Sequence, residues 1–310
     1  MLLWILLALL VLFLAFGLHL LHLAITGRRY TPETLETQLS KPAYQEIKDA
    51  SLASTDWVRA HEHQELHVMS YDGKLLHATF LPKENAKGTI LLFHGYRSCW
   101  QIDFGLVLPY YYDELGYQLL LIDQRAHGQS QGKYLTFGVR ERMDVISWTT
   151  YMGQLLGQDA PLVLGGLSMG ATTVLMASCF EFPANVRAII ADCGFTNPMD
   201  IAKSVLHRDY PQAPLGLLLP VCSFFTRLFA GFGLNDASTL DAVRESRYPI
   251  LFIHGTGDTF VPCDMTKQAF AACTSEKELV LVDGAEHGKS YVLEPSCVQA
   301  ALKAFLDTHV

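Results

Sequence analysis

The sequence predicts an α/β fold with a mostly parallel sheet and helices on both of its faces. Short apolar runs alternate with longer segments of helical periodicity along most of the 310-residue chain. The runs are apolar almost throughout, which is typical of parallel strands that are covered on both faces. Half of the residues are hydrophobic, so the chain can bury a large core.

The chain begins with an apolar segment. Residues 2–27 contain no Asp, Glu, Lys or Arg, and about 20 such residues are enough to span a bilayer. We therefore expect a single-pass transmembrane anchor over residues 1–28 that is separable from the rest of the protein. A cleaved signal peptide would have a basic residue before a shorter apolar core. A buried helix of a soluble protein is a further alternative.

Charges and cysteines suggest where the remainder of the chain lies. Arg28 and Arg29 follow the apolar segment and no basic residue precedes it, which favours a cytoplasmic main domain. The seven cysteines occur singly, and an odd number cannot all pair within one chain. A reducing compartment suits them. The net charge is −8 without a basic run, so no nucleic-acid partner is expected, and the sequence does not indicate the oligomeric state.

The main domain follows a polar connector. Residues 29–60 form this connector, and residues 61–310 form the domain. An Asp72-Gly73 turn predicts an antiparallel hairpin at its start. Strands are then expected at 88–95, 117–123, 161–167, 186–194, 248–255 and 278–284, and helices at 100–116, 139–157, 169–182 and 289–307.

One connection is much longer than the others. Residues 195–247 separate two expected strands, and their middle part is apolar with proline and glycine. We expect a helical lid inserted over the carboxyl edge of the sheet, the edge at which ligands bind in open parallel sheets. A second membrane span is disfavoured because Arg227 interrupts the apolar stretch.

A serine marks the turn between the strand at 161–167 and the next helix. Gly166-Leu167-Ser168-Met169-Gly170 has the G-x-S-x-G pattern of a nucleophile elbow, a turn so sharp that larger residues at its glycines would collide with the strand and the helix. A serine hydroxyl alone is a poor nucleophile, so the pattern requires a base and an orienting acid.

Both partners follow in the required order. Asp258 comes after the strand at 248–255, and His287 comes after the strand at 278–284. This Ser-Asp-His order predicts that His287 accepts the serine proton and that Asp258 orients the imidazole. The backbone N–H groups of Met169 and Tyr96 are the expected oxyanion-hole donors.

Other polar residues at strand ends have structural interpretations. Asp192 is the alternative acid, but the Val261-Pro262 pair after Gly257-Asp258 favours Asp258. Asp123 and Arg125 are expected to pair with each other. The histidines at the remaining strand ends, His94, His127 and His254, are expected to brace loops. No metal-ligand spacing is visible, so neither a metal nor a cofactor is expected.

Five short motifs of the chain resemble motifs of the α/β-hydrolase superfamily. They are "HGYR", "DQRAHGQS", "GLSMG", "GTGDTFVP" and "AEHG", and they occur in the family's order across about residues 60–310. The resemblance implies an α/β-hydrolase fold with an eight-stranded sheet and a Ser-Asp-His triad. More narrowly, the chain resembles bacterial membrane-anchored hydrolases of the serine aminopeptidase and acyl-hydrolase type.

The predicted function is a serine hydrolase that cleaves an ester, thioester or amide through an acyl-enzyme. The apolar insertion favours an esterase or lipase-like activity on a small-molecule or lipid-like acyl substrate. An acyltransferase or a peptidase would use the same triad. A non-catalytic membrane-anchored binding protein on this fold would normally lack a triad member. A dehalogenase or epoxide hydrolase would carry Asp at position 168.

Overall fold

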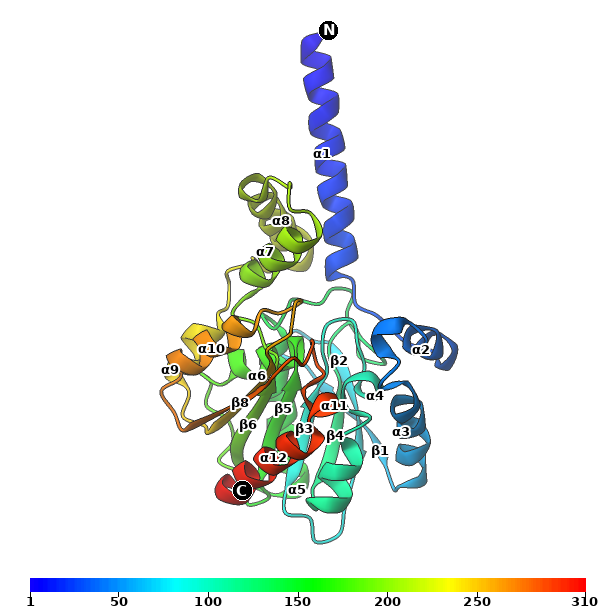
Figure 1. Cartoon of the computed structure of the whole chain (residues 1–310), viewed down its shortest axis with the longest axis vertical. Coiled ribbons are helices and arrows are strands. Elements are labelled where there is room, and N and C mark those ends of the chain that lie inside the picture. The colour runs from blue at the N-terminus through cyan, green and yellow to red at the C-terminus, as the bar shows by residue number, and fades with distance from the viewer.

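The computed structural model describes the backbone of residues 1–310 and all side chains except those of the leucines at positions 2, 3, 6, 9, 20 and 23. An eight-stranded sheet lies at the centre, and helices cover both of its faces (Figure 1). Two helices and the N-terminal helix project from one end of this body.

The sheet contains strands of both directions. Its strand order is β1-β2-β4-β3-β5-β6-β7-β8. β1 pairs antiparallel with β2, and β2 pairs antiparallel with β4, whereas the remaining pairings are parallel. The sheet is therefore mixed rather than purely parallel. A tight turn at Gly73, with a φ of 77°, joins β1 to β2 and makes these two strands antiparallel. The strands are β1 (Gln64–Met69), β2 (Leu75–Leu81), β3 (Thr89–Phe93), β4 (Gln118–Asp123), β5 (Leu162–Leu167), β6 (Val186–Asp192), β7 (Ile250–Gly255) and β8 (Lys277–Val282).

Successive residues of the central strands enter two separate cores. Leu91 and Leu164 pack on one face of the sheet, and Ile90 and Val163 pack on the other. The first face is covered by α5 (Glu141–Leu156), α6 (Met169–Ala177), α9 (Thr239–Glu245) and α10 (Cys263–Ala272). The second is covered by α3 (Lys48–Ala60), α4 (Trp100–Phe104), a π-helix (Tyr110–Glu114) and α12 (Pro295–His309). Burial on both faces explains why these strands are apolar throughout.

Residues 29–60 are largely helical and pack on the body. They form α2 (Pro32–Leu39), a short 3-10 helix (Pro42–Tyr44) and α3. Leu35 and Leu39 of α2 pack against Cys99, which precedes α4, and Ile102, which lies within it. Near the other end of the chain, the short helix α11 (Ser290–Leu293) precedes α12.

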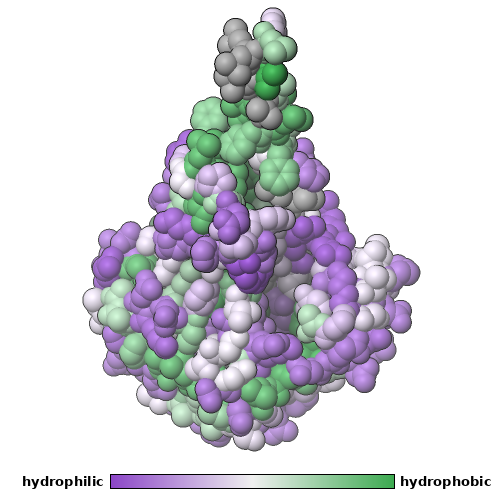
Figure 2. All heavy atoms as spheres, turned by 45° about the horizontal axis from the view of Figure 1, so that its top comes forward, coloured by the Kyte–Doolittle hydropathy of each residue, from purple (hydrophilic) through white to green (hydrophobic). Residues whose placement is uncertain are grey.

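Three helices form the projecting end of the molecule. α7 (Pro198–Asp209) and α8 (Leu215–Ala230) lie between β6 and β7 in the chain, and α1 (Leu2–Ile25) packs on α8 (Figure 1). Hydrophobic residues gather on this end, whereas the surface of the body is mixed (Figure 2). Exposed members of this group include Leu12 and Phe16 of α1 and Phe224 and Leu228 of α8.

The predicted membrane anchor is wrong. In the described part of the chain, no helix is both long and apolar enough to cross a membrane. On one side of α1, Gly17, Leu21 and Ile25 are buried by the protein itself. The structure therefore does not support the single-pass anchor over residues 1–28 or the membrane localisation inferred from it.

Candidate active site

Ser168 lies in the sharp turn between β5 and α6. Its backbone adopts φ 55° and ψ −114°, a strained conformation for a residue with a side chain. A Cβ atom at Gly170 would lie 1.7 Å from the carbonyl oxygen of Phe93, and one at Gly166 would lie 2.4 Å from the backbone of Gly170. The glycines of the G-x-S-x-G pattern are therefore required by close backbone approach.

The structure brings Ser168, His287 and Asp258 into one hydrogen-bonded chain. Ser168 Oγ donates to His287 Nε2 at 2.9 Å. His287 Nδ1 donates to Asp258 Oδ2 at 2.7 Å. The three residues come from the loops after β5, β8 and β7, which end at the same edge of the sheet. This geometry lets a base remove the serine proton while an acid holds the base.

Four hydrogen bonds surround the carboxylate of Asp258. Its Oδ1 accepts from the backbone N–H groups of Phe260 and Val261, each at 2.8 Å. Its Oδ2 accepts from His254 Nε2 at 3.1 Å as well as from His287. Burial would raise the pKa of Asp258, but the hydrogen bonds from the two histidines lower it well below its usual range. The carboxylate is thus held in its ionised form.

Asp192, the alternative acid, has a different environment at the end of β6. Its Oδ1 has no hydrogen-bond partner among the described residues. Burial raises the pKa of Asp192 to about 6. Its backbone carbonyl accepts from the N–H of Ser168 at 2.8 Å, so this residue contacts the elbow through its main chain.

The loop that carries Tyr96 lies against Ser168. A Cβ atom at Gly95 would lie 3.3 Å from the Cβ atom of Ser168, and Tyr96 and Ser168 line the same cavity. The half-buried carboxylate of Asp103 anchors the loop, because it accepts hydrogen bonds from the Gly95 N–H and, at 2.6 Å, from Ser98 Oγ. Burial raises the pKa of Asp103. Met169, the other expected donor, directly follows Ser168 at the start of α6.

Two residues near the site were missed by the sequence reasoning. His254 was interpreted only as a loop brace, yet it donates to the same oxygen of Asp258 as His287 does. Its position four residues before Asp258 was the available signal. Asp103 lies within an expected helix, and nothing in the pattern indicated that it reaches back to Gly95.

Two of the other histidines hold loops, as expected from sequence, but the predicted ion pair does not form. His94 Nε2 accepts from the Gln124 N–H at 3.1 Å, and His127 Nδ1 donates to the Arg125 carbonyl at 2.9 Å.

Asp123 binds His77 Nδ1 at 2.8 Å, whereas the guanidinium of Arg125 binds other carboxylates. The predicted pairing of Asp123 with Arg125 is therefore wrong.

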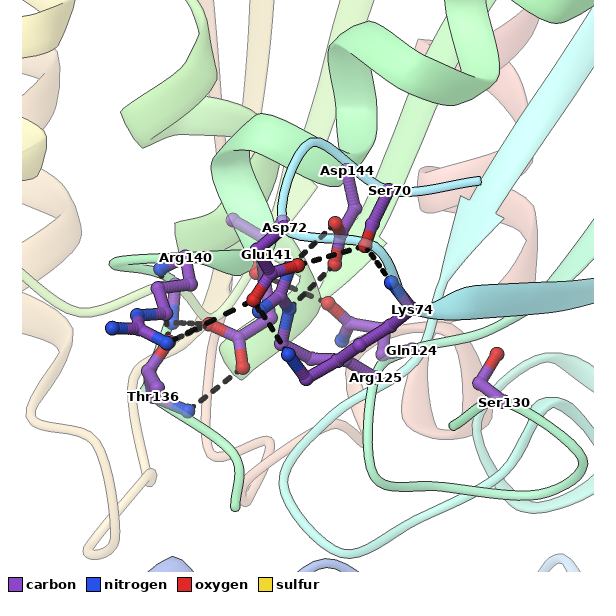
Figure 3. Close-up of polar contacts among 12 residues, drawn as sticks. Ser70, Asp72, Lys74, Gln124, Arg125, Ser130, Thr136, Arg140, Glu141 and Asp144 are labelled. Carbon is purple, nitrogen blue, oxygen red and sulfur yellow. Dashed lines mark hydrogen bonds and ion pairs between the residues drawn. The ribbon is translucent and has the colours of Figure 1, made fainter. Parts of the chain in front are cut away.

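Arg125 lies in a polar cluster that joins the β1–β2 turn to α5 (Figure 3). It binds both carboxylate oxygens of Asp144 on α5, at 2.7 and 2.6 Å, and it reaches Asp72 in the β1–β2 turn at 3.2 Å. In the same cluster, Glu141 accepts from the N–H of Thr136 at 2.7 Å. Phe137, which follows Thr136 in the chain, is thereby held in the cavity wall.

Possible metal ligands occur together at the site. In the described part of the chain, Cys193, Asp258 and His287 offer ligand atoms within 4.8 Å of one another. Asp258 and His287 are already bonded to each other. Burial raises the pKa of the Cys193 thiol well above its usual value, and a protonated thiol is a poor metal ligand. The arrangement therefore suits proton transfer better than metal binding.

Ser168 opens into an apolar cavity of about 320 Å³. Its walls come from several parts of the chain, and they include Leu21, Phe137, Phe195, Ile201, Leu218 and Leu219. Concave, mostly apolar sites with a few polar groups are typical of small-molecule binding.

Family models match most of the main domain. A model described as alpha/beta hydrolase fold matches residues 88–211, and a model described as TAP-like protein matches residues 234–309. The first match contains the Ser168 elbow, and the second contains Asp258 and His287.

Curated relatives are similar over most of the chain. The uncharacterized protein YqkD of Bacillus subtilis is 27% identical over 237 residues, which are 76% of each chain. The lysophosphatidylserine lipase ABHD12 of Danio rerio is 26% identical over 200 residues, which are 63% of this chain and 50% of the relative.

Solved structures have a similar fold. The esterase Pf2001 of Pyrococcus furiosus aligns with a TM-score of 0.64 and 21% identity, covering 81% of this chain and 94% of the esterase. Est1E of Butyrivibrio proteoclasticus, solved with ferulic acid bound, aligns with a TM-score of 0.58 and 20% identity, covering 77% of this chain and 97% of Est1E. Together with the family models, these likenesses show that the chain belongs to the α/β-hydrolase superfamily.

Proposed function

We propose that this protein is a serine hydrolase that cleaves carboxylic esters with an apolar acyl group. The observation that carries the proposal is the chain of hydrogen bonds from Ser168 through His287 to Asp258 at the edge of an apolar cavity. A nucleophile, a base and an orienting acid within hydrogen-bond distance are what acyl transfer requires.

In the first half of the proposed reaction, Ser168 Oγ attacks the carbonyl carbon of the ester while His287 Nε2 accepts the serine proton. The imidazolium that forms is stabilised by Asp258, which stays ionised because its pKa is low. The carbonyl oxygen becomes an oxyanion, which accepts hydrogen bonds from the backbone N–H groups of Met169 and Tyr96. The tetrahedral intermediate then collapses, and the alcohol leaves with the proton of His287.

In the second half, a water molecule attacks the acyl-enzyme. His287 removes a proton from this water, and the resulting hydroxide adds to the carbonyl carbon. When the second tetrahedral intermediate collapses, Ser168 Oγ leaves and recovers its proton from His287. The products are a carboxylic acid and an alcohol, and the enzyme returns to its starting state.

The substrate class is supported by the cavity and by the relatives. The apolar walls of the cavity favour an apolar acyl chain, because each buried methylene contributes about 0.8 kcal/mol. A lysophosphatidylserine lipase and two structures described as an esterase and as a ferulic acid complex are among the similar proteins. All three names are compatible with hydrolysis of carboxylic esters.

Residues 195–247 are proposed to act as the lid of this site. They include α7 and α8, and Ile201, Leu218 and Leu219 from these helices line the cavity beside Ser168. Leu218 and Leu219 are buried, whereas the neighbouring Leu217 is exposed. The lid therefore contributes apolar walls to the binding site and leaves the proposed chemistry to the edge of the sheet.

A series of p-nitrophenyl esters tests the proposal. For the full chain, we expect kcat/KM to rise from acetate to octanoate, since longer chains bury more methylene groups in the cavity. Ser168→Ala should lower turnover of every ester to the buffer rate, and Ser40→Ala, at an exposed position, should leave it unchanged. Hydrolysis that persists in Ser168→Ala, or kcat/KM that falls steadily from acetate, would contradict the proposal.

A further inference from the structure

The last two turns of α1 form part of the cavity that contains Ser168. Leu21, Ala24 and Ile25 line this cavity, on the side where α1 packs on α8. Leu21 is 6% exposed and Ile25 is 2% exposed. These residues are more than 140 positions from Ser168 in the sequence, and they lie outside the lid insertion.

Hydrogen bonds hold this end of α1 on the body. The Leu135 N–H donates to the Ile25 carbonyl at 2.9 Å, and Thr26 forms a β-bridge with Tyr134. A Cβ atom at Gly27 would lie 2.0 Å from the carbonyl oxygen of Ala126. The chain therefore passes directly over the segment that follows β4, and the end of α1 is fixed relative to the sheet.

The N-terminal segment also holds the loop that carries Tyr96. Tyr96 Oη donates to the Ala24 carbonyl at 2.9 Å, in the last turn of α1, where carbonyl groups lack partners within the helix. Tyr30 Oη donates to the Arg97 carbonyl at 3.0 Å. The N-terminal segment thus contacts both the apolar cavity and the loop next to Ser168.

We propose that the last two turns of α1 are a specificity-determining wall of the acyl site. The acyl chain of the ester extends from Ser168 into the space between α1 and α8, with Leu21 and Ile25 on one side and Leu218 and Leu219 on the other. This inference rests on the proposed esterase function. It states that the N-terminal helix selects substrates by the length of their acyl chain.

Substitutions along α1 test this proposal in the full chain. Leu21→Trp and Ile25→Trp place a larger side chain in the cavity, and Leu12→Trp is the matched control at a position that is 65% exposed. The measurement is the ratio of kcat/KM for p-nitrophenyl octanoate to that for the acetate. Since one methylene changes binding about fourfold, loss of room for two should lower this ratio at least about tenfold. Leu12→Trp should leave the ratio unchanged.

Leu21→Ala provides the opposite change and also guards against misfolding of the tryptophan variants. It enlarges the cavity, so the ester with the highest kcat/KM should become a longer one. The proposal is overturned if the tryptophan variants keep the wild-type ratio, if Leu12→Trp changes it equally, or if Leu21→Ala keeps the wild-type preference. If the wild-type chain hydrolyses neither acetate nor octanoate, the proposed function fails instead.

Discussion

The ends of β6 and β7 are neighbours in the sheet, and an aspartate lies at or just after each end in very different surroundings. Asp258, after β7, accepts hydrogen bonds from His287 and His254. Asp192, at the end of β6, has a carboxylate oxygen without a partner among the described residues. The pKa of Asp258 is lowered, and burial raises that of Asp192 to about 6.

This contrast shows that the position at a strand end does not by itself make a suitable acid. Burial raises the pKa of a carboxyl group in both places, and at Asp258 the hydrogen bonds from two histidines outweigh this effect. At Asp258 the donors are the proposed base and a second histidine, so the negative charge is available where an imidazolium would form. At Asp192 burial shifts the balance toward the neutral form, and the residue contacts the elbow through its backbone carbonyl, which suits a structural role.

The largest effect is expected from Asp258→Asn. Without the carboxylate, the imidazole of His287 loses the partner that fixes its tautomer, and kcat should fall by about 10⁴-fold, as when the acid of a serine protease triad is replaced. Asp192→Asn is the matched control, and we expect its kcat within about tenfold of the wild-type value. Both are measured with the same p-nitrophenyl ester. A large loss in Asp192→Asn with activity preserved in Asp258→Asn would reverse the assignment of the acid.

A smaller effect is expected on stability, and it should depend on pH. Asp192 stays protonated in the folded protein up to about pH 6, whereas the unfolded chain loses this proton near about pH 4. The free energy of unfolding therefore falls as pH rises between these values, by about 1 to 3 kcal/mol for this group. Asp192→Asn removes this decrease, so from pH 4 to pH 8 the variant should gain stability relative to the wild type by that amount.

Urea titrations at pH 4 and pH 8 measure this difference. Asp56→Asn, at an exposed position on α3, should show the same change with pH as the wild type. If Asp192→Asn also follows the wild type, the carboxyl group of Asp192 is not buried in the way described above.

The residues of the candidate site could be predicted because strand ends are visible in the sequence. Apolar runs locate β5, β7 and β8, and parallel strands place their carboxyl ends at one edge, so Ser168, Asp258 and His287 were expected to meet. The glycines at positions 166 and 170 are also readable, because close backbone approach tolerates few other residues.

Contacts between distant segments could not be predicted in the same way. The apolar residues of α1 were assigned to a bilayer, but periodicity does not tell whether lipid or protein covers an apolar helix, and Leu21 and Ile25 of α1 are buried by the protein. Charge pairing was similarly misjudged, since Arg125 binds Asp144 on a later helix rather than nearby Asp123. The short helix α10 was missed, because its ten residues give a weak periodic signal.

The central claim is that Ser168 is a nucleophile activated by His287, and covalent labelling tests it most directly. A fluorophosphonate probe is incubated with the full chain, and mass spectrometry locates the adduct. We predict one adduct on Ser168 in the wild type, none in Ser168→Ala, and none in heat-denatured protein, because the probe requires an activated serine. An equally labelled Ser168→Ala variant, or an adduct on another residue, would contradict the account.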